Sequence, residues 1–206
     1  LTIMALACDL IEERHGVKLT LNNIPINDPE TFELIGRGET IGLFQVESSG
    51  MRRYLKEMKP KRLEHVIAMV ALYRPGPMDL INDFIKGKQK PQTVKYPHPD
   101  LKPVLEETYG IAVYQEQALQ IANVMADYSL GEADILRRAI GKKKISIMNK
   151  EKQKFITRAR KKGYSQEIAD RVWGYIEKFA GYGFNKAHAT AYAMIAYQTA
   201  YMKARH

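Results

Sequence analysis

The sequence has little cysteine and no long hydrophobic run. Its 206 residues include one cysteine, Cys8, which excludes a disulfide framework and suits a reducing cytoplasm. The apolar N-terminal stretch is interrupted from Asp9 onward, and no apolar run approaches the roughly 20 residues that cross a bilayer. We therefore expect a cytoplasmic protein with no membrane partner, in which Cys8 is a small core residue rather than a nucleophile.

Motifs for metal-assisted phosphoryl transfer are missing as well. The chain has no Asp-x-Asp pair of the kind that holds two Mg²⁺ ions, no Walker glycine–lysine loop and no His/Cys spacing typical of zinc. Asp79 and Asp83 fit an ordinary helix face. The residues alone therefore predict no metal ligands and no catalytic residue within this chain.

Positive charge is concentrated in one segment. Residues 137–162 hold twelve basic residues and one acid, Glu151, which is a net charge of +11, whereas the whole chain carries +9. The remainder of the chain is thus slightly acidic. A single positive field of this kind attracts polyanions and favours phosphate binding through counterion release.

The first part of this segment predicts a phosphate contact. On a helix, Arg137 lies over Gly141 and Lys144. Arg138 likewise lies over Lys142. Stacked cations repel one another unless an anion lies between them, and arginine offers a planar fork for phosphate oxygens. The alternative is a solvated basic face at a helix C-terminus, where positive charge is favoured anyway; we favour phosphate contact.

The second part predicts contact with a nucleic-acid backbone. Lys150, Lys154 and Arg158 fall on one helical stripe, opposite an apolar face that includes Phe155. Lys143 precedes this stripe. The array has no pattern suited to reading base edges, so we expect contacts with DNA phosphates that do not depend on base sequence.

A glycine-rich turn before the last helix carries a second candidate site. Asn185 is placed to cap that helix, whose free N–H groups form an anion site. Lys186 adds charge and His188 a hydrogen-bond donor, so we expect these three residues to bind phosphate or nucleotide. Tyr182 or Phe184 could stack on a base; the alternative is a core position, which we accept for Phe184 taken alone.

The loop 74–77 has two prolines around a glycine and must be rigid. Because a preset arginine loses little entropy on binding, Arg74 is a candidate contact, with Tyr73 beside it. A plain surface turn is an equal alternative. Tyr192, farther along, could either face a pocket or belong to the core.

Apolar spacing and capping residues predict a mainly α fold. Helices are expected over 1–15, 28–35, 49–58, 63–72, 79–86, 114–127 and 187–204, and three more are expected to begin near Leu130, Ser146 and Ser165. Short strands are expected at 41–46 and 111–113. The β content is therefore at most a small element.

Several strings of the sequence resemble the replicative C-family DNA polymerases, the family of the α subunits of bacterial DNA polymerase III. They occur in the same order, cover nearly the whole chain and are long enough to be specific. The strings are Leu43-Phe-Gln-Val-Glu-Ser48, Ala71-Leu-Tyr-Arg-Pro-Gly-Pro77, Tyr114-Gln-Glu-Gln117, Leu136-Arg-Arg-Ala-Ile-Gly-Lys-Lys-Lys144, Lys178-Phe-Ala-Gly-Tyr-Gly-Phe-Asn-Lys-Ala-His188 and Tyr197-Gln198.

The resemblance implies that residues 36–206 are a multi-helix fingers domain and that residues 1–35 are palm-side connecting helices, in a fragment truncated at both ends. It implies a DNA-directed DNA polymerase of chromosomal replication. Its partners would be primer–template DNA, deoxynucleoside triphosphates and other replicase subunits, including the sliding clamp through regions not present here. The Mg²⁺ ligands would be palm aspartates outside this chain, which would be inactive alone.

By position, the resemblance assigns three roles. Contact with the triphosphate or nearby DNA phosphates falls to Arg137, Arg138, Lys142 and Lys144. The lining of the nucleotide pocket falls to Asn185, Lys186 and His188. A place near the nascent base pair falls to Tyr73 and Arg74.

The rival interpretation is a non-catalytic helical module that binds RNA or DNA through its basic face. It predicts a steep dependence of affinity on salt and no added affinity from a matched deoxynucleotide.

Overall fold

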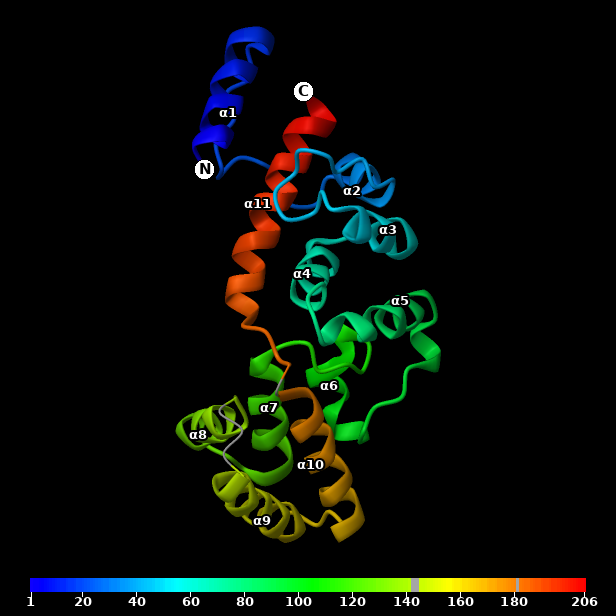
Figure 1. Ribbon diagram of the computed structural model, residues 1–206, viewed down its shortest axis with the longest axis vertical. Coiled ribbons are helices and arrows are strands. Elements are labelled where there is room, and N and C mark those ends of the chain that lie inside the picture. The colour runs from blue at the N-terminus through cyan, green and yellow to red at the C-terminus, as the bar shows by residue number, and fades with distance from the viewer. Residues whose placement is uncertain (142–144, 181) are drawn as a thin grey trace. The chain divides into compact units, whose positions relative to one another are not determined.

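The computed structural model describes residues 1–141, 145–180 and 182–206, and the fold is mainly α-helical (Figure 1). The chain divides into two compact units. Unit 1 comprises residues 1–73 and 187–206, and unit 2 comprises residues 74–186. Unit 1 is therefore built from both ends of the chain, with unit 2 inserted between its two parts.

The helices of unit 1 begin and end within one residue of the predicted bounds. They are α1 (Thr2–His15), α2 (Pro29–Gly36), α3 (Ser49–Met58), α4 (Leu63–Leu72) and all of α11 (Lys186–Arg205) except its first residue. The Asp28 carboxylate accepts a hydrogen bond from the Thr31 N–H at 2.9 Å, and Ser48 Oγ accepts one from the Met51 N–H at 3.3 Å. Gly16 ends α1 in the left-handed conformation. The five helices expected here are confirmed.

The last helix is part of the core of unit 1. The hydroxyl of the buried Tyr197 accepts a hydrogen bond from the Asp28 N–H at 2.9 Å and donates one to the Pro25 carbonyl at 2.8 Å. Its ring centre lies 5.1 Å from that of Phe32. Arg205 forms an ion pair with Asp28. These contacts join α11 to the start of α2, far away in sequence.

Unit 2 holds the remaining helices. They are η1 (Pro77–Leu80), α5 (Ile81–Gln89), η2 (Pro91–Thr93), η3 (Pro99–Leu101), α6 (Lys102–Leu105), η4 (Glu106–Thr108), α7 (Gln115–Ala126), α8 (Leu130–Gly141), α9 (Ile145–Lys161) and α10 (Gln166–Ala180). The predicted capping box is present: the Glu132 N–H donates to Ser129 Oγ at 3.3 Å, and the Ser129 N–H donates to the Glu132 carboxylate at 3.0 Å. Ser165 accepts from the Ile168 N–H at 3.2 Å at the start of α10.

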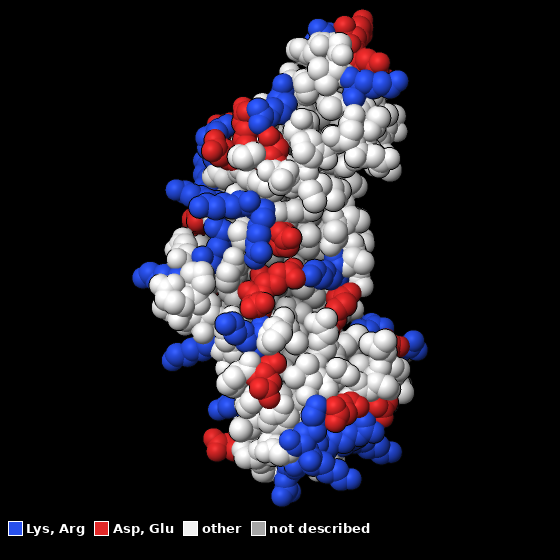
Figure 2. Space-filling model, turned by 180° about the vertical axis from the view of Figure 1, so that it is seen from behind, with Lys and Arg blue, Asp and Glu red and all other residues white. Residues whose placement is uncertain are grey.

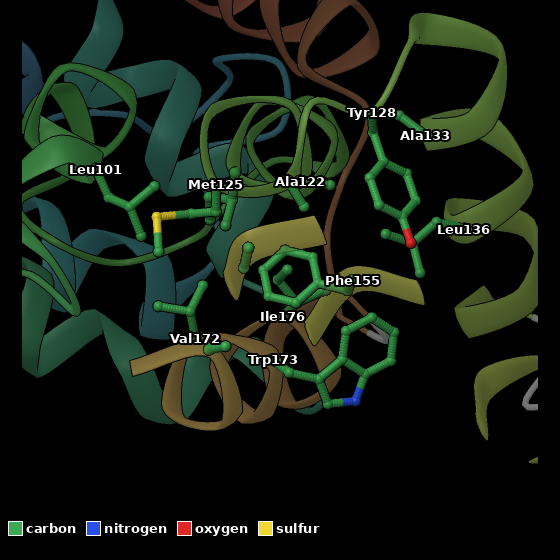
Figure 3. Packing of buried hydrophobic residues seen from close by; sticks show 14 of the residues in the cluster. Leu101, Ala122, Met125, Tyr128, Ala133, Leu136, Phe155, Val172, Trp173 and Ile176 are labelled. Carbon is green, nitrogen blue, oxygen red and sulfur yellow. The ribbon is translucent and has the colours of Figure 1, made fainter. Parts of the chain in front are cut away.

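A hydrophobic core joins α7, α8, α9 and α10. Figure 3 shows Phe155 of α9 in the middle of this core, between Trp173 of α10 and Ala122 of α7. The ring centres of Phe155 and Trp173 are 5.6 Å apart. Phe155 and Ala159 are fully buried, so the apolar face predicted for this helix is confirmed. The same packing fixes which face of α9 carries its basic residues.

Some local predictions are wrong. Residues 41–46 form turns instead of a strand, because Gly42 and Gln45 have φ angles of 80° and 64°, which no strand allows. Residues 111–113 form no strand either; the described residues contain an isolated parallel bridge between Tyr114 and Phe184. Ser146 does not cap α9, because that helix already begins at Ile145.

Two further observations concern the N-terminal helix and the bilayer. Cys8 is half-buried rather than a core residue, since most of α1 is exposed. Within the described ranges, no helix is both long and apolar enough to span a membrane.

Candidate functional site

Three separate segments of unit 2 meet around Phe184. The Phe184 N–H donates a hydrogen bond to the Val113 carbonyl at 3.0 Å, and the Gln115 N–H donates to the Phe184 carbonyl at 2.9 Å. The turn before α11 is thereby paired with the residues that lead into α7. The Arg74 guanidinium lies 4.7 Å from the centre of the Phe184 ring and donates a hydrogen bond to the Tyr182 carbonyl. The loop 74–77 thus contacts the same turn.

Gly76 permits this close approach of the loop. Its φ angle is +98°, and a Cβ atom at this position would lie 2.8 Å from Cε1 of Tyr182. Any other residue would displace either the loop or the Tyr182 ring. Partial burial lowers the pKa of Arg74, but an arginine remains charged at neutral pH. The loop therefore holds a half-buried positive charge against the turn.

Gln117 fixes the segment on the other side of the turn. Its Oε1 accepts hydrogen bonds from the N–H groups of Val113 and Tyr114, at 2.8 and 2.9 Å. Its Nε2 donates to the Val104 carbonyl at 3.0 Å and to Thr108 Oγ1 at 2.7 Å. Both ends of this buried amide are thus used inside the protein, which indicates a positioning role for Gln117 rather than ligand contact.

The carboxylate of Glu116 lies at the N-terminus of α11. It accepts hydrogen bonds from the Lys186 N–H at 3.2 and 3.1 Å and from the Asn185 side-chain amide at 3.0 Å. The sequence predicts an anion site at this helix start, and the structure places one of the protein's own carboxylates there. Glu116 therefore holds both Asn185 and Lys186 in place.

The side chain of Lys186 is also held by an acid. Its Nζ lies 2.7 Å from Glu107 Oε2 and 5.3 Å from the centre of the Tyr114 ring. The other oxygen of Glu107, Oε1, is buried and has no hydrogen-bond partner among the described residues. Lys186 and Glu107 thus form a half-buried ion pair next to the Tyr114–Phe184 bridge.

The two arginines of α8 share one acid on their own helix. Arg137 binds Asp134 Oδ1 through Nε at 2.9 Å and Nη2 at 2.7 Å, and Arg138 Nε lies 2.8 Å from Asp134 Oδ2. Hydrogen bonds from Arg137 hold the pKa of Asp134 below its usual value. The anion that stacked arginines require is thus supplied in part by the protein itself.

The stripe on α9 is partly neutralised in the same way. Arg158 makes two hydrogen bonds to the Glu132 carboxylate at 3.0 and 2.8 Å, and Lys154 Nζ lies 2.9 Å from Glu132 Oε1. Both cations also lie over the ring of Tyr128, at 5.3 and 4.8 Å from its centre. The hydrogen bonds from Arg158 and Lys154 lower the pKa of Glu132. These contacts join α8 to α9. The side chains of Lys154 and Arg158 are therefore less free to move than fully exposed side chains would be.

Lys150 differs from the other members of this stripe. It is exposed, and the structure records no acidic partner for it among the described residues. In Figure 2, basic side chains gather at the lower end of the view, where Figure 1 places α9, with acidic side chains directly beside them. Lys142, Lys143 and Lys144 lie outside the described residues.

The predicted residues Tyr73 and His188 belong to unit 1. A Cβ atom on Gly50 would lie 2.2 Å from the Tyr73 hydroxyl, so Tyr73 packs directly on the start of α3. The exposed His188 ring lies with its centre 4.3 Å from that of Tyr192, whose ring is in turn 5.3 Å from Phe44. Tyr192, left open by the sequence, is thus a half-buried member of an aromatic row.

Sequence reasoning missed the acids of the site. Asp134 stands three and four positions before Arg137 and Arg138, a helical spacing that predicts these ion pairs. Glu107 and Glu116 carry no comparable local signal, because they meet Lys186 only through the fold.

Neither a metal cluster nor an apolar hollow found in unit 1 coincides with the predicted residues. No group of three His, Cys, Asp or Glu side chains in the described part of the chain is arranged to hold a metal ion. A hollow of about 580 Å³ in unit 1 is lined by residues of α2 and by 59–61, and none of the predicted site residues borders it. The convergence around Phe184 is therefore the candidate site.

Comparison with known proteins assigns the family. Residues 1–163 match the family described as bacterial DNA polymerase III alpha subunit finger domain. The whole chain aligns with the DNA polymerase III subunit alpha of Halalkalibacterium halodurans at 50% identity, of Thermus aquaticus at 49% and of Bacillus subtilis at 49%. It covers 18%, 17% and 18% of the lengths of these relatives. The chain thus belongs to the finger-domain family of the bacterial DNA polymerase III alpha subunit.

Proposed function

We propose that this chain is the fingers portion of a DNA-directed DNA polymerase that copies DNA in chromosomal replication. In this role it binds the incoming deoxynucleoside triphosphate and the primer–template DNA while a nucleotidyl group is transferred to the primer 3′-hydroxyl. The wider partners are the other replicase subunits, including the sliding clamp, which bind outside residues 1–206. The boundary between palm-side helices (1–35) and fingers (36–206) belongs to the same proposal.

One observation carries the proposal. The three strings that resemble the polymerase family, around Arg74, Tyr114 and Lys186, are distant in the sequence and yet meet at the Tyr114–Phe184 bridge. They bring together an arginine, a lysine and a side-chain amide, which are groups that bind phosphate and nucleobase. In a chain about 50% identical to DNA polymerase III alpha subunits, a nucleotide is the ligand that suits this combination best.

The roles proposed for the described residues follow from their positions. Lys186 and Asn185, held by Glu116 and Glu107, line the nucleotide pocket, with His188 two residues farther along α11. Arg74 lies near the nascent base pair, supported by Phe184; Tyr73 precedes it. Because such groups are fixed before the ligand arrives, little ordering entropy is lost on binding.

The basic residues of α8 and α9 neutralise phosphates in this proposal. The triphosphate or neighbouring DNA phosphates are bound by Arg137, Arg138, Lys142 and Lys144. Asp134 keeps the two arginine side chains oriented until the phosphate binds. The backbone of the duplex is contacted by Lys143, Lys150, Lys154 and Arg158. That the α8 arginines and Lys186 serve one common anionic ligand is part of the hypothesis.

We propose that Mg²⁺ binds in the full-length protein and not to this chain alone. When bound, the ion would activate the primer hydroxyl and stabilise the charge on the transferred phosphate. In this proposal its carboxylate ligands belong to the palm, outside this chain, as the resemblance to the polymerase family implies. The chain alone is accordingly proposed to be inactive.

Single-nucleotide incorporation by the full-length protein tests the proposal. Lys186→Gln and Arg137→Gln should each lower kcat/KM for a matched deoxynucleotide by about 100-fold, since each removes a charge-assisted phosphate contact. Lys86→Gln on α5 makes the same charge change on an exposed lysine and should have little effect. Unchanged kinetics in both variants would contradict the site assignment. A full-length protein that binds DNA without incorporating nucleotide would favour the non-catalytic module instead.

A further inference from the structure

Unit 1 has an apolar hollow that none of the predicted site residues borders. It has a volume of about 580 Å³ and lies between α2 and residues 59–61, which follow α3. The helices α2 and α3 pack side by side here (Figure 1). Pro29, Phe32 and Pro60 supply apolar surface to the hollow. Its size is in the range of pockets that enclose a bulky side chain together with the adjoining backbone.

The fold holds the walls of the hollow in place. Pro29 is the first residue of α2, and the buried Phe32 packs on Tyr197, with the two ring centres 5.1 Å apart. On the other side, Lys59 ends α3 in the left-handed conformation and the buried Pro60 follows it. Both prolines have a fixed φ. Because these walls are ordered before a ligand arrives, little conformational entropy is lost when it binds.

Two lysines at the rim have no carboxylate partner. Glu33 is the acid among the described residues that line the hollow, and its carboxylate lies 4.0 Å from Arg37 Nη1. Arg37 is bound more closely by Glu39, at 2.9 Å. Lys59 and Lys61 also line the hollow and are exposed, and neither forms an ion pair with a described residue. The charge of these two lysines is therefore available to a ligand.

The surroundings of the hollow stay positive when every nearby acid of the two flanking segments is counted. Residues 33–39 and 52–64 together contain seven basic and four acidic residues, which is a net charge of +3. The sequence 52–62 supplies most of this charge, with six basic residues and one acid, Glu57. An excess of this sign attracts acidic ligands and disfavours basic ones.

The lining favours a peptide over a nucleic acid. A nucleobase binds to proteins by stacking on exposed rings, but the aromatic residue of the described lining, Phe32, is only 4% exposed. An apolar side chain of a peptide needs only apolar surface against which to bury itself. Carboxylates on either side of that side chain would lie at the rim, where Lys59 and Lys61 can pair with them.

We propose that the hollow between α2 and residues 59–61 binds a partner protein through a peptide segment in which a bulky apolar side chain lies between acidic residues. The apolar side chain fills the hollow, and the acidic residues pair with Lys59 and Lys61. The inference goes beyond the proposed function, whose protein partners bind outside residues 1–206, and does not depend on it.

Fluorescent peptides of the form Asp-Glu-X-Glu-Asp test the inference, with X as Leu, Ile, Phe, Trp or Ala. Anisotropy with the full-length protein measures their affinities. We expect the best bulky residue to bind about 10-fold to 100-fold more tightly than alanine, because its larger apolar surface is removed from water. The amide peptides Asn-Gln-X-Gln-Asn should bind about 10-fold more weakly than their acidic counterparts. Equal binding of alanine and the bulky residues, or of amide and acidic peptides, would overturn the inference.

Variants of the rim locate the bound peptide. Lys59→Gln/Lys61→Gln should weaken binding by about 10-fold, because an exposed ion pair contributes up to about fivefold in affinity. Lys18→Gln/Lys102→Gln removes the same charge from exposed lysines that do not line the hollow and should have much less effect. Glu33→Gln removes the acid of the rim and should strengthen binding by about threefold. Structural damage would not produce tighter binding, so this gain would identify an effect of charge.

Asn27→Trp tests occupation of the hollow without a change of charge. Asn27 is exposed, lines the hollow and does not have a left-handed backbone, so the larger side chain should be tolerated. An indole group here can occupy the hollow. We expect weaker peptide binding, with the circular dichroism spectrum and nucleotide incorporation on a short primer–template retained. Wild-type peptide affinity in this variant and in the Lys59/Lys61 variant would overturn the inference.

Fluorescent oligo-dT tests the alternative of a nucleic-acid ligand. If the Lys59/Lys61 variant loses as much affinity for oligo-dT as for the acidic peptide, the assignment to a peptide is overturned. Normal oligo-dT binding with weakened peptide binding would support the inference. Its failure leaves the proposed function intact, because that function is measured by nucleotide incorporation in the Lys186 and Arg137 variants.

Discussion

The guanidinium of Arg74 lies 4.7 Å from the centre of the Phe184 ring and donates a hydrogen bond to the carbonyl of Tyr182. The contact joins the first and the last segments of unit 2. It also orients the arginine, because a planar guanidinium can lie flat on a ring while its edge donates hydrogen bonds. A lysine can keep the charge at this position but cannot do both.

Arg74→Lys should therefore impair nucleotide incorporation without unfolding the protein. We expect kcat/KM for a matched nucleotide to fall by about 10-fold to 100-fold, because the ammonium group can no longer lie on Phe184 and donate to Tyr182 together. Steady-state incorporation by the full-length protein measures the effect. Arg62→Lys, on an exposed arginine next to Glu64, is the matched control and should leave the rate unchanged. Equal rates for the Arg74 variant and wild type would remove Arg74 from the site.

Gly76→Ala should destabilise unit 2 more than Gly163→Ala. The two glycines have nearly the same φ, +98° and +97°, but a Cβ would meet Tyr182 at 2.8 Å in the first and nothing within 4 Å in the second. Alanine at a positive φ costs about 1–2 kcal/mol or more in both. At Gly76, where ψ is −73° and lies outside the left-handed helical region, the backbone strain is larger, and the clash with Tyr182 adds about 1–3 kcal/mol. Urea unfolding of both variants measures the difference. Equal losses of stability would mean that the loop moves away from Tyr182 at little cost.

Asp134→Asn should strengthen binding to duplex DNA. The substitution removes the carboxylate shared by Arg137 and Arg138 and leaves both arginines available for phosphate. One additional phosphate contact raises affinity about eightfold at 0.1 M salt, if the affinities converge near 1 M. Fluorescence anisotropy with Asp83→Asn as the control for net charge measures the gain. Weaker binding would indicate that Asp134 orients the arginines in the bound state too.

The stability of unit 1 should fall in acid through Asp28. Burial alone would raise its pKa, but hydrogen bonds from Arg205 and Thr31 more than offset this effect and lower it. A carboxyl whose folded pKa lies below its unfolded value stabilises the fold above the unfolded pKa, about 4, and loses this contribution as pH falls through the folded pKa. The free energy of unfolding should therefore decline below about pH 4.

Asp28→Asn isolates this carboxylate. Asparagine still caps a helix, but the ion pair with Arg205 is lost, so we expect a loss of about 1–2 kcal/mol at pH 7 and a shallower decline in acid. Thermal unfolding at pH 7 and at pH 3 gives both quantities. The exposed Asp83→Asn should retain the wild-type pH dependence. A decline as steep as that of wild type in Asp28→Asn would assign the acid sensitivity to other carboxyls.

The sequence predicted most of the fold because its signals are local. Asp28 before Pro29, Ser48 and the pair Ser129–Glu132 set helix starts through contacts three residues apart. The two predicted strands failed because a run of apolar residues cannot reveal a left-handed residue such as Gln45. Strand formation also needs a partner, and in the described part of the chain the segment 111–114 gains one isolated bridge, at Tyr114.

The sequence predicted several residues of the candidate site but not how they are arranged in space. Arg74, Asn185 and Lys186 were named from glycine, proline and charge patterns, which are visible in short strings. Glu107 and Glu116 were missed, because an acid that meets a lysine through the fold looks like any other surface acid in a string. The acids that pair with this segment also lower its charge: the formal +11 of residues 137–162 becomes +9 when Asp134 and Glu132, just before it in sequence, are included.

The chain enters unit 2 at Arg74 and leaves it two residues after Phe184, and these two side chains touch. An inserted domain whose entrance and exit adjoin closes a long loop in the host by its own folding. The two parts of unit 1 that pack together around Asp28 and Tyr197 are then connected by a short distance across the folded insert, instead of by an unfolded coil of about a hundred residues. Folding of the insert would thus favour completion of the host.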